Sequence, residues 1–80
     1  MITKRQVIND ILDSVQGINE ETGLSARMWY YSKDVGIAVE VFSGKECVLE
    51  SHYHPELADY QKLHGLLTSI LTEHRNLVAA

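Results

Sequence analysis

The chain has 80 residues and a net charge of −4, with 45% hydrophobic and 22% charged residues. This length gives one domain near the lower limit of what folds without disulfides or metals, and the composition argues against a disordered chain. The seven lysines and arginines form no cluster larger than a pair, which disfavours direct binding to DNA or RNA because such binding relies on many cationic contacts to phosphates.

Cysteine content and hydropathy suggest the cellular setting. Cys47 is the only cysteine, so an internal disulfide cannot form, and we expect a reducing, cytoplasmic environment. The N-terminus lacks the pattern of a signal peptide, and no stretch approaches the roughly 18 unbroken apolar residues of a membrane span. We therefore expect a protein without a membrane partner.

A capping box near the N-terminus predicts a helix over residues 4–22. Thr3 and Gln6 have the spacing at which the threonine hydroxyl accepts from the amide of the third helical residue while the glutamine reaches back. Apolar residues then recur with a period of 3.6 on one face: Val7, Ile8, Ile11, Leu12, Val15 and Ile18. We expect Gly23 to end this helix, with Leu24 as the apolar partner of its C-terminal cap.

The middle of the chain predicts three strands. From residue 26 to residue 53 the apolar period falls to two, and aromatic and β-branched residues dominate. We place the strands at residues 26–32, 37–42 and 46–53. Because the connections are short, neighbouring strands should be antiparallel and form a three-stranded meander.

The hydrophobic pattern also predicts the register between the second and third strands. If residues 43–45 form a three-residue loop, Val41 faces Cys47 and Val39 faces Leu49, all on one apolar face. A two-residue turn would shift the pairing by one and place glutamates among the valines, which is unfavourable. We therefore expect the Cys47 thiol to point inward, where it acts as a small hydrophobe rather than as a nucleophile.

The strongest amphipathic pattern predicts a long C-terminal helix over residues 55–77. Pro55 suits the first helical position because the N–H that proline lacks would have no partner there. One arc of the helix collects the apolar residues together with two histidines: Leu57, Tyr60, Leu63, His64, Leu66, Leu67, Ile70, Leu71, His74, Leu77 and Val78. At 1.5 Å per residue the helix is roughly 35 Å long, more than a three-stranded sheet is wide. Either the first helix or a second molecule, another protein or a second copy of the chain, should cover the remaining apolar surface.

Together these elements predict an α+β fold in the order α-β-β-β-α. This order resembles that of the double-stranded-RNA-binding domain, a family that relies on a basic N-terminus of its second helix. The corresponding segment here, HPELADYQK, has two acids before its only lysine, so the chemistry of that family is not matched. The order is also similar to that of some small acidic phage-encoded inhibitors of bacterial nucleases. That similarity implies a candidate function, an acidic inhibitor that occupies a nucleic-acid-binding site on another protein.

Aromatic and acidic residues on the strands indicate an interaction surface. Because Trp29, Tyr30 and Tyr31 are consecutive, at least one of them must point away from the buried face of the sheet. A face that mixes acids with apolar side chains can receive a basic, partly apolar partner. The alternatives are an ordinary exposed face or a sheet covered on both sides. The expected interaction surface consists of Trp29, Tyr31, Glu40, Phe42 and Glu50 on the sheet and Leu71, His74 and Val78 on the long helix.

Histidine spacing and the absence of catalytic motifs complete the prediction. His52 and His54 would project from the same strand face and could contribute two ligands for Zn or Ni, although a polar strand end that leads into a helix cap explains the pair better. His64 and His74 suit a core, an interface or a pH-dependent contact between two helices. The sequence contains no GxGxxG, Walker, HExxH or CxxC motif. We therefore expect a non-catalytic interaction or regulatory module that forms a homodimer and needs no cofactor.

Overall fold

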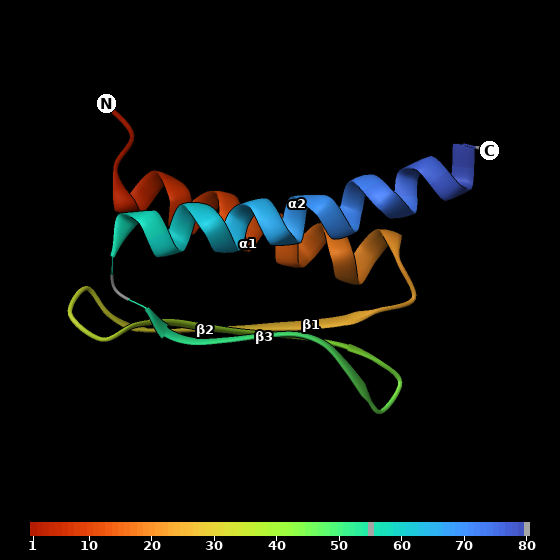
Figure 1. The fold of residues 1–80 in the computed structure, drawn as a ribbon, viewed down its shortest axis with the longest axis horizontal. Coiled ribbons are helices and arrows are strands. Elements are labelled where there is room, and N and C mark those ends of the chain that lie inside the picture. Colours follow the sequence, from red (N-terminus) through yellow and green to blue (C-terminus); the bar gives the residue numbers. More distant parts are fainter. Residues whose placement is uncertain (55, 80) are drawn as a thin grey trace.

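Five elements follow one another in the order α-β-β-β-α (Figure 1). They are α1 (Lys4–Glu21), β1 (Ser25–Ser32), β2 (Gly36–Ser43), β3 (Glu46–His54) and α2 (Leu57–Ala79). This computed structural model describes residues 1–54 and 56–79, with only the backbone for residues 53, 54 and 79. The strands form one antiparallel sheet in the order β1-β2-β3. The predicted α+β fold, with a three-stranded meander and a long C-terminal helix, is confirmed.

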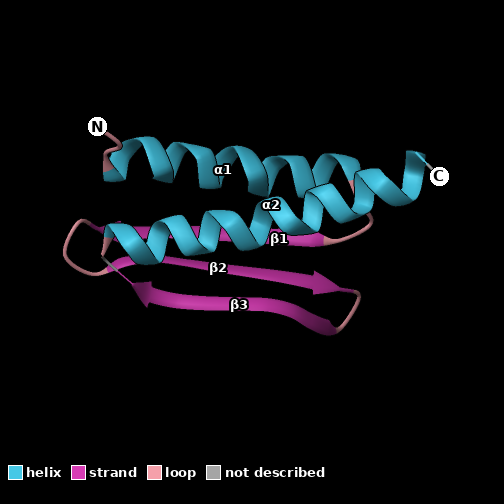
Figure 2. Ribbon diagram, turned by 45° about the horizontal axis from the view of Figure 1, so that its top comes forward, coloured by secondary structure: helices cyan, strands magenta, loops and turns pink. Residues whose placement is uncertain are grey.

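Both helices lie on the same face of the sheet (Figures 1 and 2). They pack against each other, with α1 also contacting β1 and α2 contacting β3. The core between the two layers consists of most of the apolar residues that the periodicity predicted, but Leu12 and Leu66 are each 43% exposed. Its buried members are Val7, Ile11, Val15, Ile18, Ala26, Ile37, Val39, Val41, Tyr60, Leu63, Leu67 and Leu71. The opposite face of the sheet is left without a helix from any described part of the chain.

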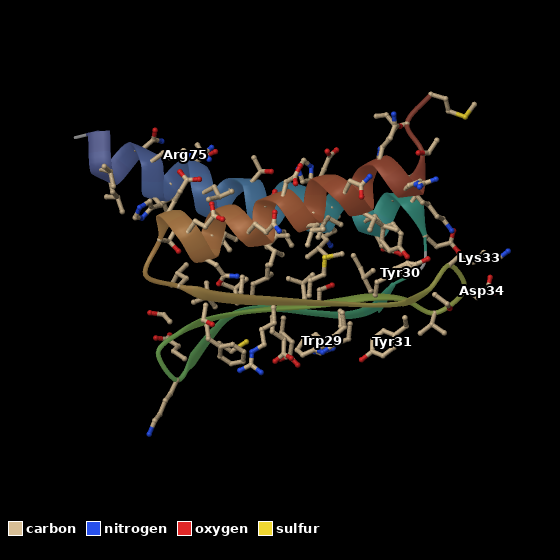
Figure 3. All side chains as sticks on the ribbon, turned by 180° about the vertical axis from the view of Figure 1, so that it is seen from behind. Trp29, Tyr30, Tyr31, Lys33, Asp34 and Arg75 are labelled. Carbon is tan, nitrogen blue, oxygen red and sulfur yellow. The ribbon has the colours of Figure 1, made fainter. Side chains whose placement is uncertain are left out.

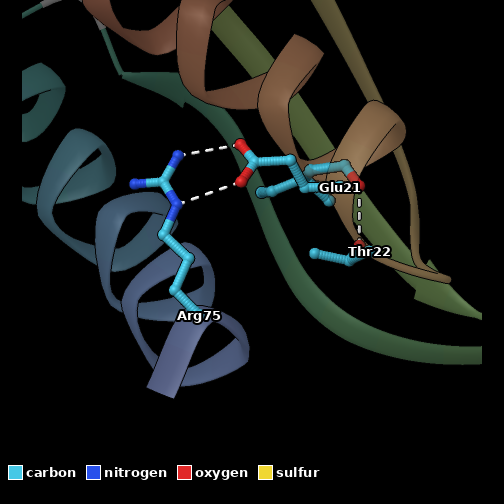
Figure 4. A network of polar contacts seen from close by, with 4 residues as sticks. Glu21, Thr22 and Arg75 are labelled. Atoms are coloured by element: carbon cyan, nitrogen blue, oxygen red, sulfur yellow. Dashed lines mark hydrogen bonds and ion pairs between the residues drawn. The ribbon is translucent and has the colours of Figure 1, made fainter. Parts of the chain in front are cut away.

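Helix α1 begins as predicted and ends differently. The amide of Gln6 donates to Thr3 Oγ1 at 3.2 Å and the amide of Thr3 donates to Gln6 Oε1 at 2.8 Å, so the capping box is confirmed. At the other end Thr22 is extended, and its amide and hydroxyl donate to the carbonyl oxygen of Ile18 at 3.1 and 2.6 Å (Figure 4). The prediction that Gly23 ends the helix is wrong, because the Thr22 cap satisfies that carbonyl and Gly23 lacks the positive φ of a left-handed cap.

Helix α2 runs without a break from Leu57 to Ala79. The predicted first residue, Pro55, lies outside the described residues. The helix instead begins where the carbonyl oxygen of Glu56 accepts from the amides of Asp59 and Tyr60, each at 3.1 Å. The remaining element boundaries differ from the predicted ones by one or two residues at most.

Close packing against α1 covers much of α2. A Cβ on Gly17 would lie 3.3 Å from Leu71 Cδ1, so the missing side chain lets the two helices approach closely. Leu71 is only 6% exposed as a result. Beyond it the end of α2 extends past the other elements (Figure 1), and Leu77 and Val78 are each 72% exposed. Helix α1 therefore covers part of the apolar stripe and leaves its C-terminal end open.

The connection between β2 and β3 contains two residues, Gly44 and Lys45, rather than the three-residue loop predicted from the sequence. Gly44 has a φ of 62°, in the left-handed region that glycine adopts without a Cβ penalty. Ser43 pairs directly with Glu46 across this turn. A turn of this length alone would have exchanged the faces of every later residue of β3.

A bulge in β3 prevents that exchange. Phe42 pairs with Cys47 whereas Val41 pairs with Leu49, so Val48 is an extra residue with no partner in β2. Leu49 returns to the helix-covered face and packs against the core. Cys47 shares the face of Phe42 and is exposed. The predicted pairing of Val41 with Cys47, and the inward thiol that followed from it, are therefore wrong.

Two polar contacts attach α1 to its neighbours. The side-chain amide of Asn19 donates to the carbonyl oxygen of Ala26 at 2.9 Å, and Asn19 Oδ1 accepts from the amide of Ala26 at 2.7 Å. This side chain satisfies backbone groups on the open edge of β1. At the end of α1, Glu21 accepts two hydrogen bonds from Arg75 of α2, at 3.1 Å from Nε and 2.8 Å from Nη2 (Figure 4). The guanidinium of Arg75 lowers the pKa of the Glu21 carboxyl.

Candidate functional site

The helix-free face of the sheet, here called the outer face, brings together most of the predicted surface residues. Strand alternation places on it Arg27, Trp29, Tyr31, Ala38, Glu40, Phe42, Cys47, Glu50 and His52. Figure 3 shows Trp29 and Tyr31 on the side of the sheet away from the helices, whereas Tyr30 points toward the helices. The strand period thus separates three consecutive aromatic residues between the two faces.

A charged row crosses the outer face from strand to strand. Arg27 of β1 pairs with Glu40 of β2, and Glu40 pairs with Glu50 of β3. Glu50 Oε1 also lies 2.7 Å from His52 Nε2, while the Arg27 guanidinium lies 5.8 Å from the centroid of the Phe42 ring. Two carboxylates directly opposite each other destabilise a sheet. The row therefore combines one cation with two neighbouring acids, an arrangement that a cationic group from outside would stabilise.

Next to this row lies the aromatic part of the outer face. Trp29 is 38% exposed and Tyr31 is 50% exposed. Trp29 pairs with Ala38 of β2. Although no described helix covers this face, Ala38 is only 1% exposed, so its neighbours on the outer face cover it. A small residue beside large rings gives this part of the surface an apolar floor bordered by aromatic side chains.

The predicted helical part of the interaction surface lies on the other side of the molecule. Leu71 is in the core, which removes it from any surface that this chain offers to a partner. Sequence reasoning missed this because the contact depends on how α1 packs against α2. His74 is half-buried, and Val78 is exposed near the end of α2. The predicted residues therefore divide between the outer face and the far end of α2.

A groove of about 440 Å³, here called the hairpin groove, separates α2 from the β2–β3 hairpin. Its apolar lining comes from Leu24, Val48, Ile70 and Leu77, and His74 also contributes. Val48 reaches the groove because it is the bulged residue, which the sequence pattern did not indicate. Part of the apolar stripe of α2 that α1 leaves uncovered, at Ile70 and Leu77, therefore lines this groove.

The metal hypothesis rested on His52 and His54. His52 pairs with Glu50 as described above, whereas the side chain of His54 lies outside the described residues. Within the described part of the chain, no three His, Cys, Asp or Glu side chains are grouped closely enough to hold a metal ion. The Sγ atom of Cys47 lies 3.5 Å from the carbonyl oxygen of Leu49 in its own strand.

None of the described helices combines the length and hydrophobicity that a membrane crossing requires. Comparisons with protein-family models, with curated proteins and with solved structures found no match to this chain.

Proposed function

We propose that the protein is a non-catalytic interaction module that binds another protein through its outer face. The observation that supports this most strongly is the position of both helices on one side of the sheet, which leaves Trp29 and Tyr31 exposed on the other side. Tryptophan and tyrosine are prominent among the residues that dominate binding energy at protein interfaces. Each presents a large apolar surface together with a polar group.

The charges of the outer face indicate the chemistry of the partner. Glu40 and Glu50 are cross-strand neighbours, and the whole chain carries a net charge of −4. A lysine or arginine of the partner would relieve the repulsion between the two carboxylates. The aromatic residues beside them favour apolar side chains near that cation. The proposed partner is thus a protein surface that is both basic and partly apolar.

Capture from an extract of the native cell tests this proposal when the bait variants are matched. The first variant, Trp29→Ala/Tyr31→Ala, removes the aromatic side chains from the outer face. The control, Leu12→Ala/Leu66→Ala, removes two apolar side chains of similar exposure from the helices. We expect wild type and control to capture the same partner, and the outer-face variant to capture at least about tenfold less. Equal capture by all three folded baits would overturn the proposal.

The second candidate function, an acidic inhibitor of a nucleic-acid-binding protein, draws support from the adjacent Glu40 and Glu50. A mimic of nucleic acid depends on charge, so partner binding should weaken steeply with salt. It should also fall more in Glu40→Gln/Glu50→Gln than in Trp29→Ala/Tyr31→Ala. If binding depends mainly on the aromatic residues, the same assay should show a larger loss of binding in Trp29→Ala/Tyr31→Ala than in Glu40→Gln/Glu50→Gln.

A further inference from the structure

A second candidate site lies on the helix side of the molecule, away from the outer face. It is a pocket of about 480 Å³ where the first turns of α1, the end of β1 and the first turns of α2 meet. Its lining consists of Lys4, Arg5, Ile8, Tyr30, Lys33 and Tyr60. Figure 3 shows Tyr30 on the helix side of the sheet, with Lys33 in the turn that follows β1. A pocket of this volume is within the range that accepts small organic ligands.

Positive charge is concentrated around this pocket. Three of the seven lysines and arginines of an acidic chain line it, and none of its described lining residues is acidic. Lys4 and Arg5 stand in the first turn of α1, where there is no acidic residue. Cations there are unfavourable because the N-terminal end of a helix already carries partial positive charge. A bound anion would interact favourably with both the side chains and the helix. Asp34 adjoins Lys33 in sequence but is not among the lining residues.

An unpartnered buried hydroxyl gives independent support for a ligand. Tyr60 is 1% exposed, and its hydroxyl has no hydrogen-bond partner among the described residues. Burial, together with the nearby Tyr30, raises the pKa of Tyr60, so at neutral pH the phenol keeps its proton and can donate. Tyr60 and Tyr30 both line this pocket. Buried polar groups normally have partners, and leaving one unsatisfied costs about 1–3 kcal/mol.

We propose that this pocket binds a small organic acid with an apolar body. The carboxylate would lie near the cationic groups of Lys4, Arg5 and Lys33. Ile8 and the ring of Tyr30 would contact the apolar body, and the Tyr60 hydroxyl would donate a hydrogen bond to a ligand oxygen. The site would thus require both a negative charge and an apolar group. Because its residues are separate from the outer face, failure of either proposal leaves the other intact.

Titration of the full chain with four probes, followed by amide chemical shifts in NMR, tests the required ligand chemistry. Octanoate and benzoate combine a carboxylate with an apolar body, octanol lacks the charge, and inorganic phosphate lacks the apolar body. We expect saturable binding of the two carboxylates, with the largest shifts at Ile8, Tyr30 and Lys33. Octanol and phosphate should bind at least about tenfold more weakly, a difference of roughly 1.4 kcal/mol. The absence of saturable carboxylate binding, or equal binding of octanol, would overturn the proposal.

Three variants test the residues themselves. Tyr60→Phe removes only the hydroxyl, and we expect it to weaken octanoate binding about three- to tenfold without lowering the stability of the free protein, because no internal hydrogen bond is lost. Lys33→Gln should also weaken binding. Lys62→Gln, which removes a cation outside this pocket, is the matched control and should bind as wild type does. Unchanged affinity in both Tyr60→Phe and Lys33→Gln would overturn the assignment of the ligand to this pocket.

Discussion

At the scale of single residues, Asn19 has a larger structural role than its exposed position on α1 suggests. Its side chain makes the two hydrogen bonds to Ala26 that a neighbouring strand would otherwise provide. Neither helical periodicity nor strand alternation could predict this contact, because its two residues meet only when α1 folds back along the edge of β1.

We expect Asn19→Ala to lower the free energy of unfolding by about 1–3 kcal/mol, because two hydrogen bonds are lost and the backbone groups of Ala26 must find water instead. Gln16→Ala on the same helix is the control, since Gln16 is also exposed, and should change stability little. Urea denaturation followed by circular dichroism measures both. A loss in Asn19→Ala no larger than in the control would show that water replaces the asparagine without cost.

At the scale of the elements, two glycines within helices allow a matched comparison. Gly17 of α1 faces Leu71 of α2, whereas a Cβ added at Gly65 would meet nothing within 4 Å in the described part of the chain. Alanine should stabilise a helix interior by up to about 1 kcal/mol relative to glycine. We therefore expect Gly65→Ala to approach that gain and Gly17→Ala to gain less, because Leu71 must shift. Thermal unfolding of both variants gives the comparison, and an equal gain would mean that the helices are not closely packed at Gly17.

The ion pair between α1 and α2 should make stability depend on pH. The pKa of Glu21 is lowered from its ordinary value of 4.5 in the folded protein, so the folded state favours the ionised carboxyl. The stabilisation is present above that ordinary value and is lost as the pH falls through the lower folded value. The effect should be small because both side chains are exposed. In thermal melts between pH 6 and 3, we expect Glu21→Gln to lose less stability on acidification than either wild type or the control Glu20→Gln.

The types of the elements were largely predictable from the sequence, whereas the register between β2 and β3 was not. Each helix and strand buries one face, so the apolar period of the sequence indicated the type of element. The predicted register between β2 and β3 was wrong because the pairing depends on the length of the turn at Gly44 and on the bulge at Val48. The effects of these two features on the direction of later side chains cancel. The predicted three-residue loop correctly placed Leu49 on the core face, but it paired Leu49 with Val39 instead of Val41. Cys47, between the turn and the bulge, was assigned to the wrong face.

At the scale of the whole molecule, the sequence was enough to predict the part of the candidate surface that lies on the strands, but not the part expected on α2. Strand alternation was enough to group Trp29, Tyr31, Glu40, Phe42 and Glu50 on one face. No local sequence pattern indicates which face of the sheet the helices cover, because that depends on how both helices pack together. For the same reason, Leu71 was assigned to an interface with a second chain, whereas α1 of the same chain covers it.

The exposed end of α2 leads to an expectation for the assembly. Leu77 and Val78, together with the lining of the hairpin groove, leave an apolar surface that a second copy of the chain could cover. We expect light scattering at micromolar concentration to give the mass of a dimer, and Leu77→Ser/Val78→Ser to give that of a monomer. A monomeric wild type would end the homodimer hypothesis and leave the outer-face proposal standing.

The irregular pairing of β3 has a consequence for aggregation. As one of the two edge strands, β3 offers its unpaired backbone groups to any other extended chain. Fibrils grow when such groups form a flat, evenly spaced template onto which further chains stack. Here the template is interrupted by the register shift at Val48 and by another between Ser51 and His54, and bulges twist a strand away from flatness. The same irregularity that returns Leu49 to the core should therefore protect the protein from amyloid-like growth along its open border.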